Sequence, residues 1–202
     1  MARKQSCIDA LRRPSGGPFI DAGYQEVILP SIYEASTFIG KMGEEKEEKM
    51  WTFDTRGDNP TRVALVPEIT GMIQELWNSG WSKSMKKPTR LFYLSRCYRY
   101  DRPQKGRYRE FTQFGIELLG NRNPEQEKQE VIDLLDKCLS DLKIPYTLER
   151  EIKRGIGYYT EDGFEAESEA LGAQRQIAGG GRYAEGIGWA IGVDRVMLLK
   201  EG

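Results

Sequence analysis

The sequence has 202 residues, 39% of them hydrophobic, and its 30 Lys and Arg balance 31 Asp and Glu, so we expect one soluble domain over residues 1–202. It contains no histidine and only three scattered cysteines, which excludes His-based catalysis and argues against a structural zinc or a disulfide framework, so we expect no metal site made by the protein alone. No apolar run reaches the roughly 18 residues that span a bilayer, and the start lacks a signal-peptide core, so we expect a cytoplasmic protein without membrane association.

The first part of the chain predicts alternating strands and helices. Proline and glycine mark the boundaries between these elements, and Pro67 occupies a position tolerated in the first turn of a helix. The expected elements are a strand over 24–29, a helix from Pro30 to about Ile39, strands over 50–53 and 62–66 around a turn at 57–60, and a helix from Pro67 to about Trp77.

The second part predicts a long antiparallel hairpin of strands over 91–100 and 110–119, followed by a helix. Asn123 is the expected N-cap of that helix and Pro124 its first residue. Apolar residues then recur with helical spacing, so one helix face should pack on a core. Short strands follow up to Gly192, and a helix over 193–200 closes the chain. The expected fold class is α+β, an antiparallel sheet flanked by helices.

The charge is unevenly distributed. Residues 82–109 carry ten basic side chains and one acidic one, a local charge of +9 that leaves −10 for the rest. A cluster of like charges often forms only a solvent-exposed surface with no binding role. Here aromatic residues alternate with the basic ones, which indicates an ordered surface that would attract a nucleotide triphosphate or a nucleic acid.

The second strand of the hairpin presents a candidate binding surface. Gln113, Gly115 and Glu117 share one face, because alternate residues of a strand point the same way. Because glycine has no side chain, we expect Gly115 to leave unoccupied space between the two polar side chains, where a zwitterion could approach the backbone. A solvated strand face would give the same spacing.

The segment over 96–120 reads RCYRYDRPQKGRYREFTQFGIELLG. It closely resembles motif 2 of class II aminoacyl-tRNA synthetases, in the form R-x-E-R-P-Q-K-G-R-Y-R-x-F-x-Q-x-G-x-E of the histidyl-tRNA synthetases. The pattern is met from Arg99 to Glu117, with Asp101 in place of the Glu.

Other segments resemble further motifs of that family, and together they extend from residue 23 to about 200. They are 23–34, similar to motif 1; 66–70, similar to R-P-E-G-T; 154–159, similar to the histidine-specific R-G-L-D-Y-Y; 179–183, similar to G-G-R-Y-D; and 190–195, similar to motif 3. The resemblance therefore implies the class II synthetase fold for nearly the whole chain.

The family condenses histidine with ATP to histidyl-adenylate and passes the histidyl group to its tRNA. The resemblance implies ATP and Mg²⁺ as cofactors, tRNA(His) as acceptor and a homodimer formed through motif 1. It implies that Arg99, Arg154 and Arg195 are catalytic, with Arg99 and Arg154 at the α-phosphate and Arg195 at the γ-phosphate. Phe111 would lie on the adenine, and Asp101 and Arg107 would complete the ATP site.

The resemblance also implies a histidine site. Glu68 and Thr70 would take the α-amino group, and Gln113 would hold the ammonium or the carboxylate end. Glu117 and Tyr159 would address the two imidazole nitrogens, because one nitrogen donates and the other accepts. Tyr158 and Arg154 would lie beside them.

The chain departs from the family in two carboxylates and in length. Gly157 and Ala184 stand where the family has acidic residues, and the family's insertion and anticodon-binding domain have no counterpart. Two alternatives therefore stay open: a non-catalytic histidine sensor like the regulatory subunit of ATP phosphoribosyltransferase, and an adenylating ligase with an acceptor other than tRNA.

Overall fold

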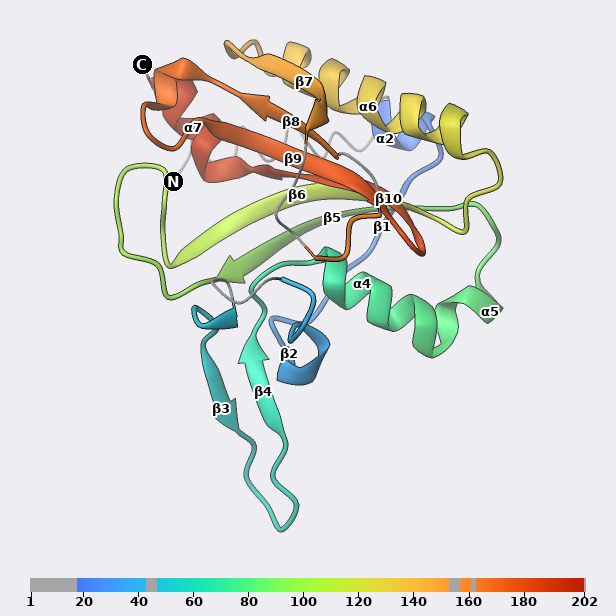
Figure 1. Ribbon diagram of the computed structural model, residues 1–202, viewed down its shortest axis with the longest axis vertical. Helices are drawn as coiled ribbons and strands as arrows, with labels where there is room; N and C mark the ends of the chain where they lie inside the picture. Colours follow the sequence, from blue (N-terminus) through green and yellow to red (C-terminus); the bar gives the residue numbers. More distant parts are fainter. Residues whose placement is uncertain (1–17, 43–46, 153–156, 161–162, 202) are drawn as a thin grey trace.

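Seven strands form the main sheet in the order β1-β5-β6-β10-β9-β8-β7 (Figure 1). The computed structural model describes residues 18–42, 47–152, 157–160 and 163–201. All pairs in this sheet are antiparallel except β1 with β5. The strands are β1 (Gln25–Glu26), β5 (Thr89–Tyr98), β6 (Glu110–Leu119), β7 (Thr147–Ile152), β8 (Gly163–Glu167), β9 (Gln176–Tyr183) and β10 (Gly186–Gly192).

Within the described residues, three helices cover one face of the sheet: α2 (Pro18–Asp21), α6 (Pro124–Asp141) and α7 (Val193–Glu201). Residues of β6 with even numbers, such as Phe114 and Ile116, pack there against Val131 and Leu135 of α6. Each such buried apolar side chain contributes on the order of 1.5–3 kcal/mol. The alternation of β6 therefore divides it into a face under α6 and an opposite face.

Helix α4 (Thr70–Leu76) packs on that opposite face, where Met72 and Ile73 meet Tyr93 and Cys97 of β5 in a second core. The helix continues through a π-helical turn, η2 (Trp77–Trp81), into α5 (Ser82–Ser84). Odd-numbered side chains of β5 and β6 thus face α4, and two of them, Phe111 and Gln113, line the candidate site.

A second sheet has the order β2-β4-β3, and its β3–β4 hairpin extends away from the main sheet (Figure 1). Its strands are β2 (Ile32–Glu34), β3 (Thr52–Asp54) and β4 (Arg62–Leu65). The prediction of a helix from Pro30 to Ile39 is wrong, because Ile32 pairs with Leu65 across the sheet. Only a short 3-10 turn, η1 (Ala35–Thr37), follows.

Most other predicted elements are confirmed. The hairpin forms with ten residues in each strand, and the side chain of Asn123 caps α6 by accepting from the Gln126 backbone N–H at 3.5 Å. The helix predicted from Pro67 begins three residues later, at Thr70. A short 3-10 turn, η3 (Glu169–Leu171), separates β8 from β9. Among the helices described, none is both long and apolar enough to cross a bilayer.

Candidate functional site

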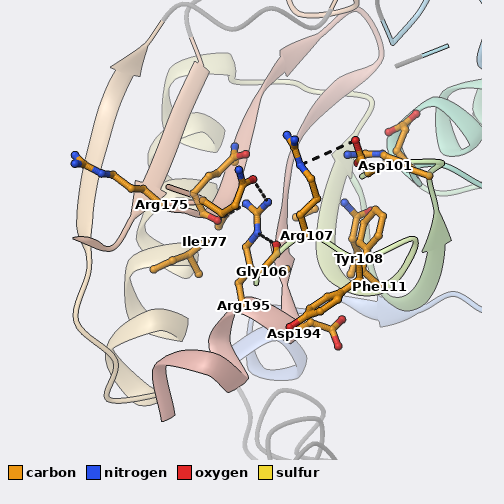
Figure 2. A pocket seen from close by; sticks show the side chains of 18 of the residues that line it. Asp101, Gly106, Arg107, Tyr108, Phe111, Arg175, Ile177, Asp194 and Arg195 are labelled. Carbon is orange, nitrogen blue, oxygen red and sulfur yellow. Dashed lines mark hydrogen bonds and ion pairs between the residues drawn. The ribbon is translucent and has the colours of Figure 1, made fainter. Parts of the chain in front are cut away.

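A cavity of about 450 Å³ opens on the sheet face opposite α6 (Figure 2). Its walls come from β6, β9, the ends of β8 and β10, the starts of α4 and α7, the connection between β5 and β6, and the segment of Tyr158 and Tyr159. Ten of the predicted site residues line it: Glu68, Thr70, Arg99, Asp101, Arg107, Phe111, Gln113, Tyr158, Tyr159 and Arg195. The fold therefore brings together predicted residues from four separate parts of the chain: 68–70, 99–113, 158–159 and 195.

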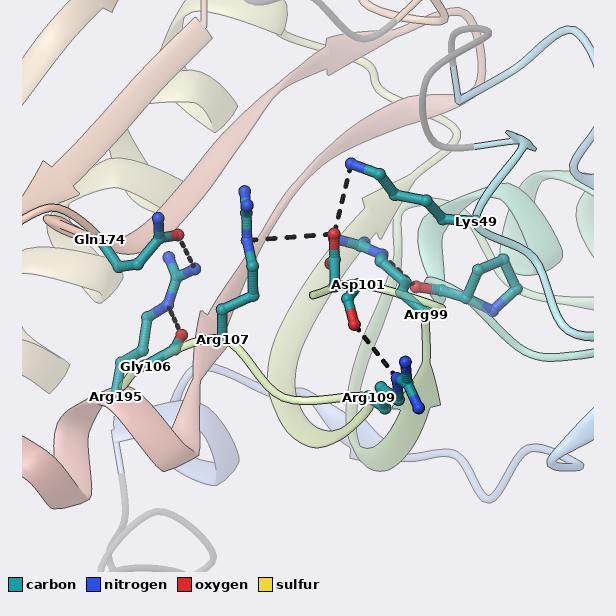
Figure 3. A network of polar contacts seen from close by, with 9 residues as sticks. Lys49, Arg99, Asp101, Gly106, Arg107, Arg109, Gln174 and Arg195 are labelled. Carbon is teal, nitrogen blue, oxygen red and sulfur yellow. Dashed lines mark hydrogen bonds and ion pairs between the residues drawn. The ribbon is translucent and has the colours of Figure 1, made fainter. Parts of the chain in front are cut away.

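Four arginines line this cavity, and three of them, Arg99, Arg107 and Arg195, lie near one another (Figure 3). Arg195 is held by three acceptors: the Gly106 carbonyl at 2.8 Å and the Gln174 side-chain oxygen at 3.3 Å, both drawn in Figure 3, and the Gln176 carbonyl at 2.5 Å. Burial lowers the pKa of Arg195, and the positive charges of Arg107 and Arg99 lower it further. This mutual repulsion would be relieved by an anion bound among the three groups.

Asp101 is the acidic group beside these arginines. Its Oδ1 lies 3.3 Å from Lys49 Nζ and 4.0 Å from Arg107 Nε, and its carbonyl accepts from Arg109 Nε at 3.2 Å (Figure 3). These contacts fix the connection between β5 and β6 at the cavity wall. Lys49 was not predicted, since it lies in a polar segment without a motif.

Arg99 and Phe111 face each other at the end of the β5–β6 hairpin. The Arg99 Cζ lies 5.1 Å from the centroid of the Phe111 ring, and Arg99 Nε donates to the Pro67 carbonyl at 3.0 Å. The next residue, Thr112, donates its backbone N–H to Asp194 at 2.6 Å. The hairpin end is thereby fixed against the start of α7, and an aromatic face and a cation stand side by side.

The other end of the cavity carries a carboxylate held in a fixed orientation. Glu68 Oε1 accepts from the Gly71 backbone N–H at 2.7 Å, and its Oε2 accepts from the Tyr158 hydroxyl at 3.4 Å. Burial raises the pKa of Tyr158, and the charge of Glu68 raises it further, so the phenol stays protonated and donates. Such a carboxylate can receive an ammonium group.

Glu117 lies beneath the cavity and is not part of its lining. It is 0% exposed, and its two oxygens accept from the Thr70 hydroxyl at 2.7 Å and the Tyr183 hydroxyl at 2.6 Å. Burial raises the pKa of Glu117 to about 8, although the hydrogen bonds from Tyr183 and Thr70 lower it. Glu117 therefore has an indirect connection to the cavity: it accepts a hydrogen bond from Thr70, and Thr70 lines the cavity.

The prediction of unoccupied space at Gly115 is wrong. Tyr93 pairs directly with Gly115 across the hairpin, and its hydroxyl lies 2.4 Å from where a Cβ would stand. The space freed by the missing side chain is taken by this phenol. A comparable close approach occurs at Gly181, where a Cβ would stand 2.6 Å from the ring of Tyr159.

Arg154, predicted at both the ATP and the histidine sites, lies outside the described residues. Sequence reasoning assigned no role to Tyr183 or Gln174. Tyr183 belongs to the quoted 179–183 segment, so a signal for it was present, whereas Gln174 stands in no motif. Nothing in the sequence pattern pointed to the pairing of Tyr183 with Glu117.

The arrangement combines two binding chemistries in one cavity. The arginines and Phe111 suit a nucleotide, because guanidinium groups bind phosphate oxygens and the ring offers a stacking face. Glu68, Thr70 and Gln113 suit a small zwitterion next to it. In the part of the chain that is described, no group of three or more Cys, Asp or Glu gathers as metal ligands.

Comparison with known proteins identifies the family. A model of the histidyl-tRNA synthetase family matches residues 4–149. The histidine–tRNA ligase of Archaeoglobus fulgidus is 41% identical over 127 residues, covering 63% of this chain and 30% of that protein, and that of Sulfolobus acidocaldarius is 40% identical over 142 residues, covering 70% and 32%. The chain thus spans about a third of the length of these relatives.

A more distant relative, the histidine–tRNA ligase of Clostridioides difficile, is 25% identical over 285 residues, covering 89% of this chain and 67% of that protein. This alignment is longer than the chain itself, so the relative contains residues within the aligned region that this chain lacks.

Solved structures confirm the fold class. A histidine–tRNA ligase subunit from Alicyclobacillus acidocaldarius superposes with a TM-score of 0.77 at 17% identity, covering 99% of this chain and 93% of that one. A Bacillus halodurans protein described as an ATP phosphoribosyltransferase regulatory subunit/histidyl-tRNA synthetase gives 0.73 at 16% identity, covering 98% and 79%. The fold is that of the class II aminoacyl-tRNA synthetases, and the chain belongs to the histidyl-tRNA synthetase family.

Proposed function

We propose that the protein activates histidine with ATP, forming histidyl-adenylate and pyrophosphate. The observation that carries this proposal is that one cavity holds both the three arginines and the fixed carboxylate of Glu68. In this reaction a carboxylate oxygen of histidine attacks the α-phosphorus, and pyrophosphate leaves. The reaction needs positioning and positive charge more than acid–base chemistry, so a chain without histidine can perform it.

On the nucleotide side, Arg99 would bind the α-phosphate and Arg195 the γ-phosphate, with adenine against Phe111. The contact between Arg99 and Phe111 supports this, because the two side chains lie next to each other, as groups that bind a base and its first phosphate would have to. The three acceptors around Arg195 leave it further N–H groups for a phosphate, since a guanidinium has five. Asp101 would hold Arg107 in place beside them.

On the amino-acid side, Glu68 and Thr70 would take the ammonium group, and Gln113 would bind the polar backbone of the substrate. Tyr158 and Tyr159, whose rings contact each other edge to face with centroids 4.8 Å apart, would lie together on one side of the imidazole. Glu117 would act on the substrate through Thr70, which it fixes by a 2.7 Å hydrogen bond. Arg154 would join the α-phosphate from the segment next to these tyrosines.

Mg²⁺ fits this cavity as a partner of ATP. The ion usually binds substrate phosphates, one or two carboxylates and several waters, so a cage of protein ligands is not needed. Glu167 supplies a carboxylate in the cavity wall. The ion would neutralise phosphate charge as pyrophosphate departs.

Amino-acid-dependent exchange of pyrophosphate into ATP, measured with all twenty amino acids, tests the proposal. We expect exchange with histidine alone. Exchange with a different amino acid, or with none, would reject histidine activation. Calorimetric titration of histidine distinguishes a protein that binds histidine without activating it.

That second function, a non-catalytic histidine-binding regulator, is favoured by one observation. The Bacillus halodurans structure named for a regulatory subunit superposes on 98% of this chain. Against it stand the three arginines in the cavity, because a sensor of histidine has no need of a triphosphate site.

We further propose tRNA(His) as acceptor and a homodimer as the assembled form. The +9 charge of residues 82–109 supports the first, and a filter-binding assay with tRNA(His) tests it. Ile28 and Ile32, in the segment similar to motif 1, are 90% and 49% exposed, which supports the second. Light scattering of the wild type and of Ile28→Asp tests the dimer, since a charge at the interface should yield monomers.

A further inference from the structure

A buried thiol contacts the one amide side chain that the predicted site places at the substrate. Cys97 Sγ lies 3.1 Å from Gln113 Oε1. Cys97 is 0% exposed, whereas Gln113 lines the cavity. The register pairs Cys97 with Phe111 and Ser95 with Gln113, so the two residues are diagonal neighbours on the face that carries the cavity.

The thiol is the donor in this contact. Burial raises the pKa of Cys97, and although the charge of Arg99 lowers it, the group stays protonated. A thiol is a weak donor through S–H and a weak acceptor through sulfur, and because Sγ contacts Oε1, the acceptor end of the glutamine amide, the thiol donates here. The hydrogen bond therefore fixes the Gln113 amide with its oxygen toward Cys97 of β5.

The fixed orientation leaves the donor end of the amide for the cavity. With Oε1 engaged by Cys97, Gln113 presents the two N–H groups of Nε2, which bind acceptors such as a carboxylate oxygen and repel an ammonium group. Glu68 has the opposite character, since its oxygens are acceptors held by Gly71 and Tyr158. The two ends of a zwitterion are thus matched by two fixed and opposite polarities.

We propose that Cys97 is a positioning residue that commits Gln113 to the carboxylate end of the bound amino acid. This inference rests on the proposed function, because it names how the same cavity orients its substrate. Cys97 touches Gln113 and does not itself line the cavity.

Calorimetric titrations of the full chain with histidine and with histidinol test the proposal. Histidinol keeps the imidazole and the ammonium group but has a hydroxymethyl group in place of the carboxylate. We expect Cys97→Ala to lower the preference for histidine over histidinol by about three- to tenfold, the effect of one neutral hydrogen bond. Cys97→Ser keeps a donor and should keep the preference, and the affinity for ATP should be unchanged in both.

Cys138→Ala is the matched control, because Cys138 is a buried thiol of α6 in the core on the other face of the sheet. It should leave the ratio of the two affinities unchanged. A second variant, Gln113→Glu, makes the test independent of the folding of Cys97→Ala. It replaces the amide donors with a carboxylate, so the variant should lose affinity for histidine more than for histidinol.

A ratio that stays the same in Cys97→Ala, or an equal loss of affinity for both ligands, would overturn the inference and leave histidine activation standing. An equal loss for both ligands in Gln113→Glu would overturn it as well. If the wild type binds neither ligand, the proposed function fails, and this inference fails with it.

Discussion

The hydroxyl of Tyr183 donates a 2.6 Å hydrogen bond to Glu117 across an intervening strand. Tyr183 ends β9 and Glu117 belongs to β6, with β10 between them. Gly188 of β10 pairs with Glu117, and a Cβ on it would stand 1.9 Å from Glu117 Oε2. The contact therefore depends on a strand position without a side chain.

We predict that Gly188→Ala destabilises the protein by about 1–3 kcal/mol, the range for overfilled cores. The new methyl group would collide with the Glu117 carboxylate and with the Ile116 carbonyl, which lies 2.4 Å from the Cβ position. The free energy of unfolding from urea titrations measures the effect.

Gly192→Ala is the matched control. Gly192 belongs to the same strand, and the nearest atoms to its Cβ position lie at ordinary contact distances, the closest at 3.6 Å, so its substitution should change the unfolding free energy by less than about 0.5 kcal/mol. Equal effects of the two substitutions would contradict the packing of Glu117 against Gly188.

We predict that Glu117 makes the stability fall as the pH rises from about 4.5 to 8. Its pKa is raised from the ordinary 4.5 to about 8, chiefly by burial, so in this window the folded state binds a proton that the unfolded state releases. The contribution is complete below pH 4.5 and is lost as the pH passes 8, with a slope of at most about 1.4 kcal/mol per pH unit.

Urea titrations of the wild type and Glu117→Gln at several pH values measure this slope. The wild type should lose stability relative to the variant as the pH rises, because the carboxamide that replaces the carboxyl group does not titrate. Parallel pH profiles would show that Glu117 is ionised throughout.

We also predict that Glu117→Gln weakens the binding of histidine more than that of ATP. The carboxyl group of Glu117 accepts from Thr70 through one oxygen and from Tyr183 through the other, whereas a carboxamide has one oxygen and an NH₂ group that only donates. Thr70 lines the cavity and would lose its fixed orientation. Calorimetry with each ligand measures the difference, and a change confined to ATP affinity would refute it.

The elements with strong local signals were predictable. Asn123 and Pro124 marked the start of α6, and the alternation of β5 and β6 gave their hairpin, because caps and periodicity are local properties. The strand at Ile32 was missed because its pairing with Leu65 is non-local. Pairing between segments far apart in the sequence leaves no mark on the local pattern.

In the candidate site, too, some features were predictable from the sequence and others depend on the three-dimensional structure. The motif resemblance placed Phe111 and Gln113 in the cavity that the structure shows. It could not show that Tyr93 fills the space at Gly115, because this depends on the strand register. Nor could it show that Glu117 lies beneath the cavity, because this depends on Thr70 standing above it.

The last prediction concerns Arg99, for which we expect Arg99→Ala to raise the barrier to adenylate formation by roughly 2–4 kcal/mol, as for the loss of one preorganised charge donor. The Pro67 carbonyl holds the Arg99 guanidinium at 3.0 Å beside Phe111, so its charge is in place before the phosphate arrives. Pyrophosphate exchange at saturating histidine measures the barrier. Arg96→Ala is the control, because Arg96 lies three residues earlier, in β5, and forms an exposed ion pair with Glu110 at 2.7 Å, and such pairs contribute little. Exchange by Arg99→Ala at the rate of Arg96→Ala would remove Arg99 from the reaction.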